Sequence, residues 1–317
     1  MLYNNLAQHR PIHWGGSLMR CEKPGKICES LWFLGRAESC VYLLEGQDES
    51  IIISGGMSYI APAIVRQIDE FGLDESKIRN ALILHAHFDH IGIVPFLRER
   101  YPAIKVYVSS RGAEILSEPR SIATINKFSH SVAMHMGMEQ ELSSGHRDWH
   151  TGLKMEVVSD EDVIELGDMD VRIIETPGHS SCSVSAYVTQ IQALFPSDGG
   201  GIPWKDKIVP APNSNFVQYA ESLKKLQSLH VKYICADHFG YIYGEEAESY
   251  LNNSLQTAYD EYQKMEKVYA ETGDVNLAAK KVASLFIADN PDYLLTQEIY
   301  EGVCRQMMKQ IARAQSA

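Results

Sequence analysis

Apolar residues follow two different periods in the first part of the chain, and each period predicts a different element. Three short runs rich in β-branched and aromatic residues, at residues 30–34, 40–44 and 50–54, are separated by polar segments that contain Gly. This spacing predicts the strands of an antiparallel meander. Between residues 59 and 71 apolar positions recur every three to four residues, which predicts an amphipathic helix, and a strand over residues 81–84 follows.

The middle of the chain alternates between strand and helix patterns. We predict helices over residues 94–100 and 216–229, and a helical spacing in a stretch rich in Met and His at residues 121–150. Strand patterns lie at residues 105–108, 153–158, 163–166, 171–175, 184–189, 193–195 and 233–236. Because strands dominate both ends of this region and helices lie between them, the order favours an α/β fold with two mixed sheets packed face to face and helices outside.

After Gly244 the apolar pattern becomes helical throughout. Helical stripes follow one another at residues 247–269, 275–286 and 294–311. We therefore predict a larger domain over residues 1–244 and a helical domain over residues 245–317. The apolar face of the first stripe is too wide for a solitary surface helix, so we expect it to pack on the larger domain, to cover the mouth of its site, or to pair with a second copy in a homodimer.

Composition narrows the class of protein. The 317 residues are 45% hydrophobic, which is enough for a sizeable core. With 41 acidic and 29 basic side chains the net charge of −12 repels phosphate backbones, so we expect no nucleic-acid partner. No apolar run approaches the roughly 18 residues needed to cross a bilayer and no signal-peptide pattern opens the chain, so we expect a cytoplasmic protein with no membrane partner. The six cysteines form no Cys-x-x-Cys pair and are expected to be free thiols.

The densest cluster of chemistry-bearing side chains directly follows the strand predicted at residues 81–84. It reads His85-Ala86-His87-Phe88-Asp89-His90. Imidazole is the commonest nitrogen ligand of zinc, and alternate residues leaving a strand can point into one cavity while the next pair turns toward a second. The pattern therefore predicts metal ligands, and the alternative is a polar loop whose histidines cap a strand.

Further candidate ligands follow later strands. His179 comes after a Pro-Gly turn, Asp198 precedes three glycines that allow close approach of the backbone, and His238 follows the strand at residues 233–236. A lone His or Asp at the end of a strand is usually a surface residue. It is their shared position after strands that makes these three candidates.

Together, the motif at residues 85–90, His179 in Thr-Pro-Gly-His, Asp198 and His238 resemble in order and spacing the motifs of the metallo-β-lactamase-fold hydrolases. The resemblance covers roughly residues 28–244. It implies a four-layer αβ/βα sandwich, here with a C-terminal α-helical extension, and a dinuclear metal site at one edge.

The resemblance also implies which side chains hold two divalent metal ions. One metal is expected on His85, His87 and His179, and the other on Asp89, His90 and His238, with Asp198 bridging them. Zinc is favoured by this donor set, and iron and manganese also suit histidine and carboxylate ligands.

The helical tail makes the resemblance closer to the thioester-cleaving members, such as glyoxalase II and 2-aminobenzoylacetyl-coenzyme A thioesterase. The expected substrate is therefore a small-molecule thioester of the acyl-coenzyme A type. Two divalent cations that share one water lower its pKa toward neutrality, and the resulting bridging hydroxide attacks the carbonyl carbon. Asp89 is the expected catalytic residue, because it can orient the nucleophile and then shuttle a proton. The sequence assigns no substrate-binding residue.

Three positions depart from the pattern of these hydrolases. Ser54 stands where many relatives carry an Asp that steadies a metal ligand, which could change metal affinity or identity. Ser197 replaces the usual Gly before Asp198. Asp237 replaces the usual Gly before His238, and could compete with it as a ligand.

Other functions stay open at this point. A phosphodiesterase or a lactonase can use the same site, and a metabolite-binding regulatory protein with vestigial hydrolysis is a non-enzymatic alternative. Residues 121–150 either fold over the metal cleft, with methionines lining an apolar pocket, or form a partly buried helical insert.

Overall fold

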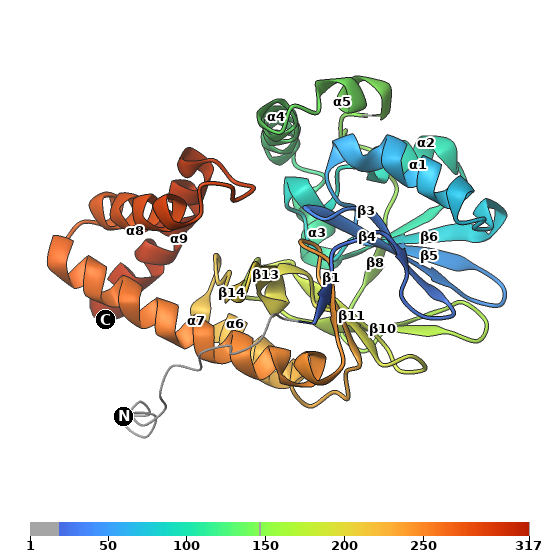
Figure 1. Ribbon diagram of the computed structural model, residues 1–317. Coiled ribbons are helices and arrows are strands. Elements are labelled where there is room, and N and C mark those ends of the chain that lie inside the picture. The colour runs from blue at the N-terminus through green and yellow to red at the C-terminus, as the bar shows by residue number, and fades with distance from the viewer. Residues whose placement is uncertain (1–18, 146, 317) are drawn as a thin grey trace.

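The computed structural model describes residues 19–145 and 147–316, and its strands form two large sheets (Figure 1). The first sheet has the order β2-β3-β4-β5-β6-β7-β8. Its strands are β2 (Gly25–Lys26), β3 (Leu31–Arg36), β4 (Ser39–Glu45), β5 (Ser50–Ile53), β6 (Ile78–Leu82), β7 (Lys105–Ser109) and β8 (Glu156–Val158). The strands β3, β4 and β5 pair antiparallel, which confirms the predicted meander, whereas β5 to β8 pair parallel.

The second sheet has the order β1-β16-β15-β12-β11-β10-β9. Its strands are β1 (Arg20–Cys21), β9 (Val163–Glu165), β10 (Asp170–Glu175), β11 (Val184–Val188), β12 (Ala193–Phe195), β15 (Tyr233–Cys235) and β16 (Tyr241–Tyr243). All of these pairs are antiparallel except β12 with β15. A separate antiparallel ribbon, β13 (Ile202–Trp204) and β14 (Lys207–Val209), follows β12.

The two sheets pack face to face through one apolar layer. Tyr42 of β4 meets Phe195 of β12 with ring centroids 5.4 Å apart, and the Tyr42 hydroxyl donates to the carbonyl of Ala236 at 2.6 Å. Both faces of β4 and β5 are buried, because helices cover the side that does not face the other sheet. This is the reason why their sequences are nearly continuous apolar runs.

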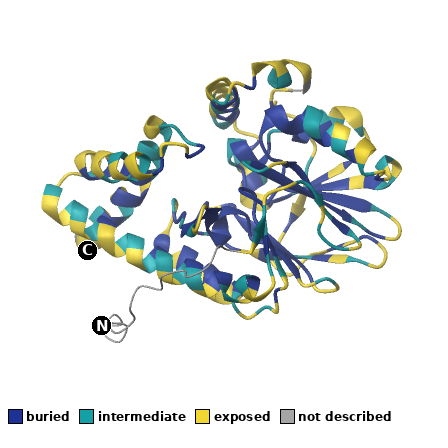
Figure 2. Cartoon of the chain, in the orientation of Figure 1, coloured by how far each residue is buried: buried dark blue, intermediate teal, exposed yellow. Residues whose placement is uncertain are grey.

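Helices form the outer layers. The first sheet is covered by α1 (Ala61–Glu70), α2 (Val94–Arg100) and α3 (Ser110–Ile115), and α4 (Pro119–His135) and α5 (Glu139–Gly145) lie outside this layer, against α1 and the loops at residues 58–60 and 88–90. The second sheet is covered by α6 (Phe216–Leu226) and by the first half of α7 (Glu245–Thr272). Figure 2 shows that the strands are mostly buried while the helices expose their outer faces. The layers confirm the expected four-layer αβ/βα sandwich.

The C-terminal helices continue from the second sheet. The helix α7 runs past that sheet, and α8 (Val275–Asp289) and α9 (Gln297–Ser316) pack on its second half (Figure 1). Gly273 ends α7 in the left-handed conformation, with φ 63°, and the Asp274 side chain caps the N-terminus of α8. Because the first half of α7 shares an apolar cluster with β12 and β15, the division of the chain at residue 244 stays a prediction, as does pairing of these helices in a homodimer.

Several short strands were missed by the sequence pattern. The strands β13, β14 and β16 span three residues each, and β13 contains Pro203. A period of two cannot be recognised over so few residues. Within the described part of the chain, no helix combines the length and apolar character that crossing a membrane requires.

Candidate metal centre

The loop after β6 carries the predicted His-x-His-x-Asp-His motif to the edge where the two sheets meet. The strand β6 ends at Leu82, two residues before the predicted end, and the carbonyl of Leu84 accepts a hydrogen bond at 2.8 Å from the amide of Val184 in the second sheet. His85, the next residue, therefore lies where the two sheets meet. A short 3₁₀ turn, η3 (Phe88–His90), begins after His87 and contains Asp89 and His90.

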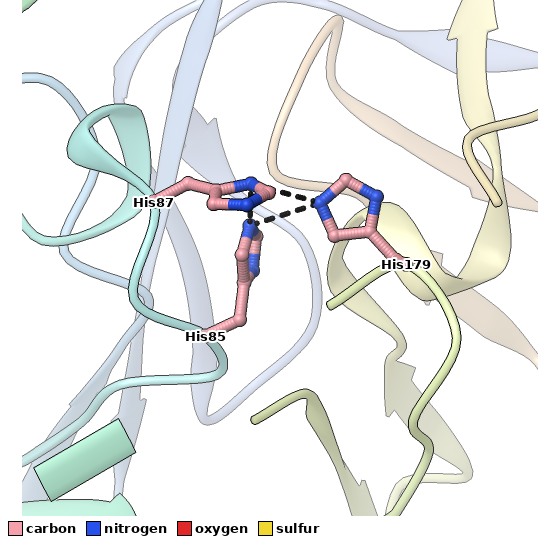
Figure 3. A group of neighbouring side chains, drawn as sticks. All are labelled: His85, His87 and His179. Atoms are coloured by element: carbon pink, nitrogen blue, oxygen red, sulfur yellow. Dashed lines mark hydrogen bonds between the residues drawn. The ribbon is translucent and has the colours of Figure 1, made fainter. Parts of the chain in front are cut away.

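Three histidines, His85, His87 and His179, form the first candidate ligand group, and their rings converge from two loops (Figure 3). Nε2 of His179 lies 3.0 Å from Nδ1 of His87 and 3.2 Å from Nε2 of His85. Nε2 of His85 lies 3.1 Å from Nδ1 of His87. Nitrogens that surround one tetrahedral zinc at its usual bond length are roughly 3.3 Å apart, so this spacing fits a single cation at the centre.

The second candidate ligand group consists of Asp89, His90 and His238. The Nε2 atoms of His90 and His238 lie 3.3 Å apart, and each lies 3.6 Å from Oδ2 of Asp89. All three side chains are buried or nearly so. The donor atoms of this group are therefore also spaced for one cation.

Asp198 lies between the two groups. Its Oδ2 is 3.3 Å from Nε2 of His90 and 3.5 Å from Nε2 of His179, and its Oδ1 is 3.7 Å from Nε2 of His238. The short turn η4 (Ser197–Gly200) presents this carboxylate, and Gly201 follows at φ 84°. A Cβ atom on Gly201 would lie 2.6 Å from Oγ of Ser254 in α7, so glycine is required there by both space and conformation.

Each of four imidazoles has a partner on its outer nitrogen. Nδ1 of His179 donates to the carbonyl of Ala211 at 2.8 Å, and Nδ1 of His238 donates to the carbonyl of Glu38 at 2.7 Å. The outer nitrogens of the other two are bonded by side chains, His90 Nδ1 by Asp237 at 2.7 Å and His85 Nδ1 by Ser197 at 3.0 Å. A proton on Nδ1 leaves the lone pair of Nε2 free to face the centre, which is the arrangement that a metal requires.

The two groups differ in charge. Burial, reinforced by the neighbouring histidines, lowers the pKa of the first group's imidazoles, His85 to well below its usual range, His87 to about 4, and His179. In the second group burial also opposes protonation, but the Asp198 and Asp89 carboxylates outweigh it and raise the pKa of His90 and His238. In return, the two imidazoles overcome burial and lower the pKa of Asp89 to about 2 and that of Asp198 well below its usual range. The imidazoles of the first group and the two carboxylates are therefore deprotonated and ready for a cation, whereas a cation at the second group would displace the protons that the carboxylates favour on His90 and His238.

Asp237 lies behind the ligand groups and not among them. His85, His90 and Asp237 also come close enough to hold a cation. However, the hydroxyl of Ser197 lies between His85 and the Asp237 carboxylate and bonds both. Ser54, the other departure from the family pattern, has a buried hydroxyl with no hydrogen-bond partner among the described residues. The Ser54 side chain therefore steadies no ligand.

An aromatic cluster beside the centre was not predicted from the sequence. Tyr293, in the loop between α8 and α9, packs against Trp204 and Phe239, with ring centroids 5.2 and 6.5 Å apart. Burial, with the nearby Asp198 and Asp89 carboxylates, raises the pKa of the Tyr293 phenol far above its usual range. The Tyr293 hydroxyl therefore lies within electrostatic reach of the ligand carboxylates. In the sequence, Tyr293 stands beside Asn290-Pro291 in the break between two predicted helices, and nothing there indicates a functional role.

The segment rich in Met and His is helical and lies over the motif loop. Phe128 of α4 packs against Phe88 of η3 with ring centroids 5.7 Å apart. The methionines do not share one face, since Met138 is buried and Met134 is 64% exposed. The segment therefore covers the loop, but its methionines do not together line one pocket.

Comparison with known proteins agrees with this geometry. A family model described as the metallo-beta-lactamase superfamily matches residues 35–238. A metallo-beta-lactamase fold-containing protein of Sulfurisphaera tokodaii is 27% identical over 222 residues, which cover 68% of this chain and 78% of the relative. An acyl-coenzyme A thioesterase of Bos taurus is 23% identical over 206 residues, which cover 60% of this chain and 67% of the relative.

The fold of the whole chain also has a counterpart among solved structures. A metallo-beta-lactamase family protein of Thermus thermophilus aligns with a TM-score of 0.65 at 16% identity, over 92% of this chain and 96% of that one. This share includes part of the C-terminal helices. The family match, the sandwich and the converging histidines and aspartates lead to one conclusion: the chain belongs to the metallo-β-lactamase superfamily, a superfamily of metallohydrolases.

Proposed function

We propose that this protein is a metal-dependent hydrolase that uses two divalent metal ions to cleave a thioester of the acyl-coenzyme A type. The observation that carries the proposal is the pair of ligand groups with Asp198 between them, each spaced for one cation. The similarity to a thioesterase of Bos taurus supports the choice of thioester over other acyl substrates.

The donor atoms fit two cations of zinc, iron or manganese type, because they are imidazole nitrogens and carboxylate oxygens at coordination spacing. His85, His87 and His179 would hold one ion, and Asp89, His90 and His238 the other, with Asp198 shared. When bound, the ions would supply Lewis acidity and activate water for attack on the carbonyl carbon.

The chain's own residues supply the remaining functions. Asp89 is ionised at neutral pH, since its pKa is lowered to about 2, so it can accept a hydrogen bond from the attacking water and orient it. Tyr293 packs against Phe239, which follows His238, and its hydroxyl stays protonated, so it is the chain's candidate donor to the substrate carbonyl oxygen as negative charge develops there. A thiolate is a good leaving group, and the reaction therefore needs no strong general acid at the sulfur.

A cavity next to the aromatic cluster of Tyr293 suits the rest of the substrate. It has a volume of about 420 Å³ between β14 and the helices α7, α8 and α9. Phe286 and Tyr300 line it, and both pack against Tyr293, with centroids 4.9 and 5.9 Å away. Its other walls are mostly apolar and carry both signs of charge, with Lys207 and Lys264 beside Glu261 and Asp289. An elongated substrate with an apolar portion fits these walls.

The test is thiol release from a panel of acyl-coenzyme A thioesters by protein of known metal content. We expect release that depends on the metal, that prefers one acyl chain length, and that is lost when a chelator strips the protein and regained when the metal is returned. The Asp89→Asn variant should turn over slowly and hold the second metal ion more weakly, because its amide is both a poor base and a weaker ligand than the carboxylate.

The matched control is Asp69→Asn, the same change on the exposed face of α1. Silence across the panel with two metals bound would contradict the thioester proposal and would direct the search to lactones and phosphodiesters. A protein that binds no divalent metal would contradict the hydrolase itself.

A further inference from the structure

Four buried side chains form a continuous hydrogen-bonded line behind the metal centre. Nδ1 of His85 lies 3.0 Å from Oγ of Ser197, Ser197 bonds Oδ2 of Asp237, and the same oxygen lies 2.7 Å from Nδ1 of His90. All four are at most 3% exposed. His85 belongs to the first ligand group and His90 to the second, so this line joins the two groups.

The chemistry of the acceptor sets the direction of every bond in the line. An ionised carboxylate only accepts, so Nδ1 of His90 and the hydroxyl of Ser197 both donate to Asp237. Ser197 donates its only hydroxyl hydrogen to Asp237, so its oxygen must accept a hydrogen bond from Nδ1 of His85. Both imidazoles then carry their proton on Nδ1 and turn an Nε2 lone pair toward the centre.

The backbone at Ser197 would suit a glycine. Ser197 has φ 50°, in the left-handed region where glycine is preferred. A glycine would relieve the backbone but would remove the hydroxyl that links His85 to Asp237.

Among the described residues, Ser54 beside the first sheet gives no comparable hydrogen bond to a candidate ligand. The hydroxyl of Ser54, at the end of β5, is buried and has no hydrogen-bond partner in the described part of the chain. The carboxylate that contacts an outer imidazole nitrogen is that of Asp237, which follows β15 in the opposite sheet.

We propose that Asp237 and Ser197 are a shared pair of positioning residues, in which Asp237 orients a ligand of each metal ion and Ser197 extends its action to His85. This inference rests on the proposed function only in requiring two metal ions. It predicts that the two residues affect different numbers of metal positions. Removal of the Asp237 carboxylate weakens both metal positions, whereas removal of the Ser197 hydroxyl weakens the position of His85, His87 and His179.

The experiment is competition of the metal-free protein with a chromophoric chelator for Zn²⁺, which yields a dissociation constant for each ion. Loss of a residue that hydrogen-bonds a metal ligand typically lowers the affinity for the metal by about 10- to 100-fold. We expect Asp237→Asn to weaken both constants by about that factor, and Ser197→Ala to weaken one by about 10-fold and leave the other within about twofold. Absorption of the Co²⁺-loaded protein reports ligand geometry separately, and its visible bands should shift in both variants.

The matched control is Ser54→Ala, which removes a buried hydroxyl that has no partner and should change neither constant nor the Co²⁺ spectrum. Equal weakening of both ions by Ser197→Ala, or constants within about twofold of wild type in Asp237→Asn, would overturn the proposal. Circular dichroism of the metal-free variants checks their fold, and Ser197→Ala decides the question if Asp237→Asn does not fold. Wild-type protein that binds no metal would instead contradict the proposed function.

Discussion

The metal edge of the sandwich and the C-terminal helices are built by opposite means. At the edge, buried polar atoms face one another at set distances, as in His179 and His87, whose nearest nitrogens lie 3.0 Å apart. In the helices, α8 and α9 meet through small or flexible apolar side chains such as Ala283 and Met308. Polar clusters depend on direction and charge, whereas apolar contacts depend on the area that they bury. Single changes at the edge should therefore alter chemistry without unfolding, and single changes in the helices should lower stability without removing metal.

The largest effect is expected from Asp198→Ala at the edge. Because Asp198 faces both ligand groups, its loss should release at least one metal ion and lower kcat/KM by at least about 100-fold. Metal analysis and thiol release measure the two effects. Asp69→Ala on the surface of α1 is the control, and a variant at position 198 with full metal and normal turnover would remove this residue from the centre.

The opposite behaviour is expected from Met308→Ala in the helices. Met308 is fully buried, so its truncation should cost about 2 to 5 kcal/mol of unfolding free energy in urea while metal stoichiometry at 25 °C stays unchanged. Lys309→Ala, at the exposed neighbouring position, should cost no more than about 0.5 kcal/mol. Loss of metal from folded Met308→Ala protein would break the comparison between the two regions.

Tyr293→Phe tests a side chain that the helices contribute to the edge. We expect kcat/KM to fall on the order of 100-fold, as for the loss of one donor to a developing oxyanion, with unchanged metal content. Tyr300→Phe removes a hydroxyl from the same aromatic cluster at the wall of the proposed substrate cavity, so it should change KM at most and leave kcat and metal content unchanged. Equal losses in both variants would point to packing of the cluster and not to the Tyr293 hydroxyl.

The smallest effect is expected from Gln310→Ala, which tests mechanical contact between the two regions. The Gln310 side chain accepts from the Phe216 amide at 2.9 Å and donates to the carbonyls of Pro212 and Asn213. These residues directly follow Ala211, whose carbonyl holds His179. We expect a loss of about 1 kcal/mol in stability and faster metal release to a chelator. Gln306→Ala, exposed one turn earlier, is the control, and identical release rates in the two variants would separate the helices from the edge.

The family and the layered fold followed from local patterns. Six consecutive residues carry the His-x-His-x-Asp-His motif, so one loop brings four candidate ligands together whatever the rest of the chain does. Long periodic stretches such as α7 (Glu245–Thr272) were also recognised, whereas three-residue strands such as β16 (Tyr241–Tyr243) carry too little periodicity. His179, Asp198 and His238 were found only by their shared position after strands and by the resemblance that followed.

By itself, the sequence determined the superfamily, the sandwich and the side chains that converge at its edge, because these follow from composition, period and a dense motif. Only the tertiary structure decided that Asp237 contacts His90 from behind and that Tyr293 packs against Trp204 and Phe239. His90 and Asp237 are 147 positions apart, and their hydrogen bond exists because two sheets meet at one edge with particular side-chain directions. A contact of that kind leaves no trace in the period of apolar residues, since it depends on how separate elements pack and not on how each one forms.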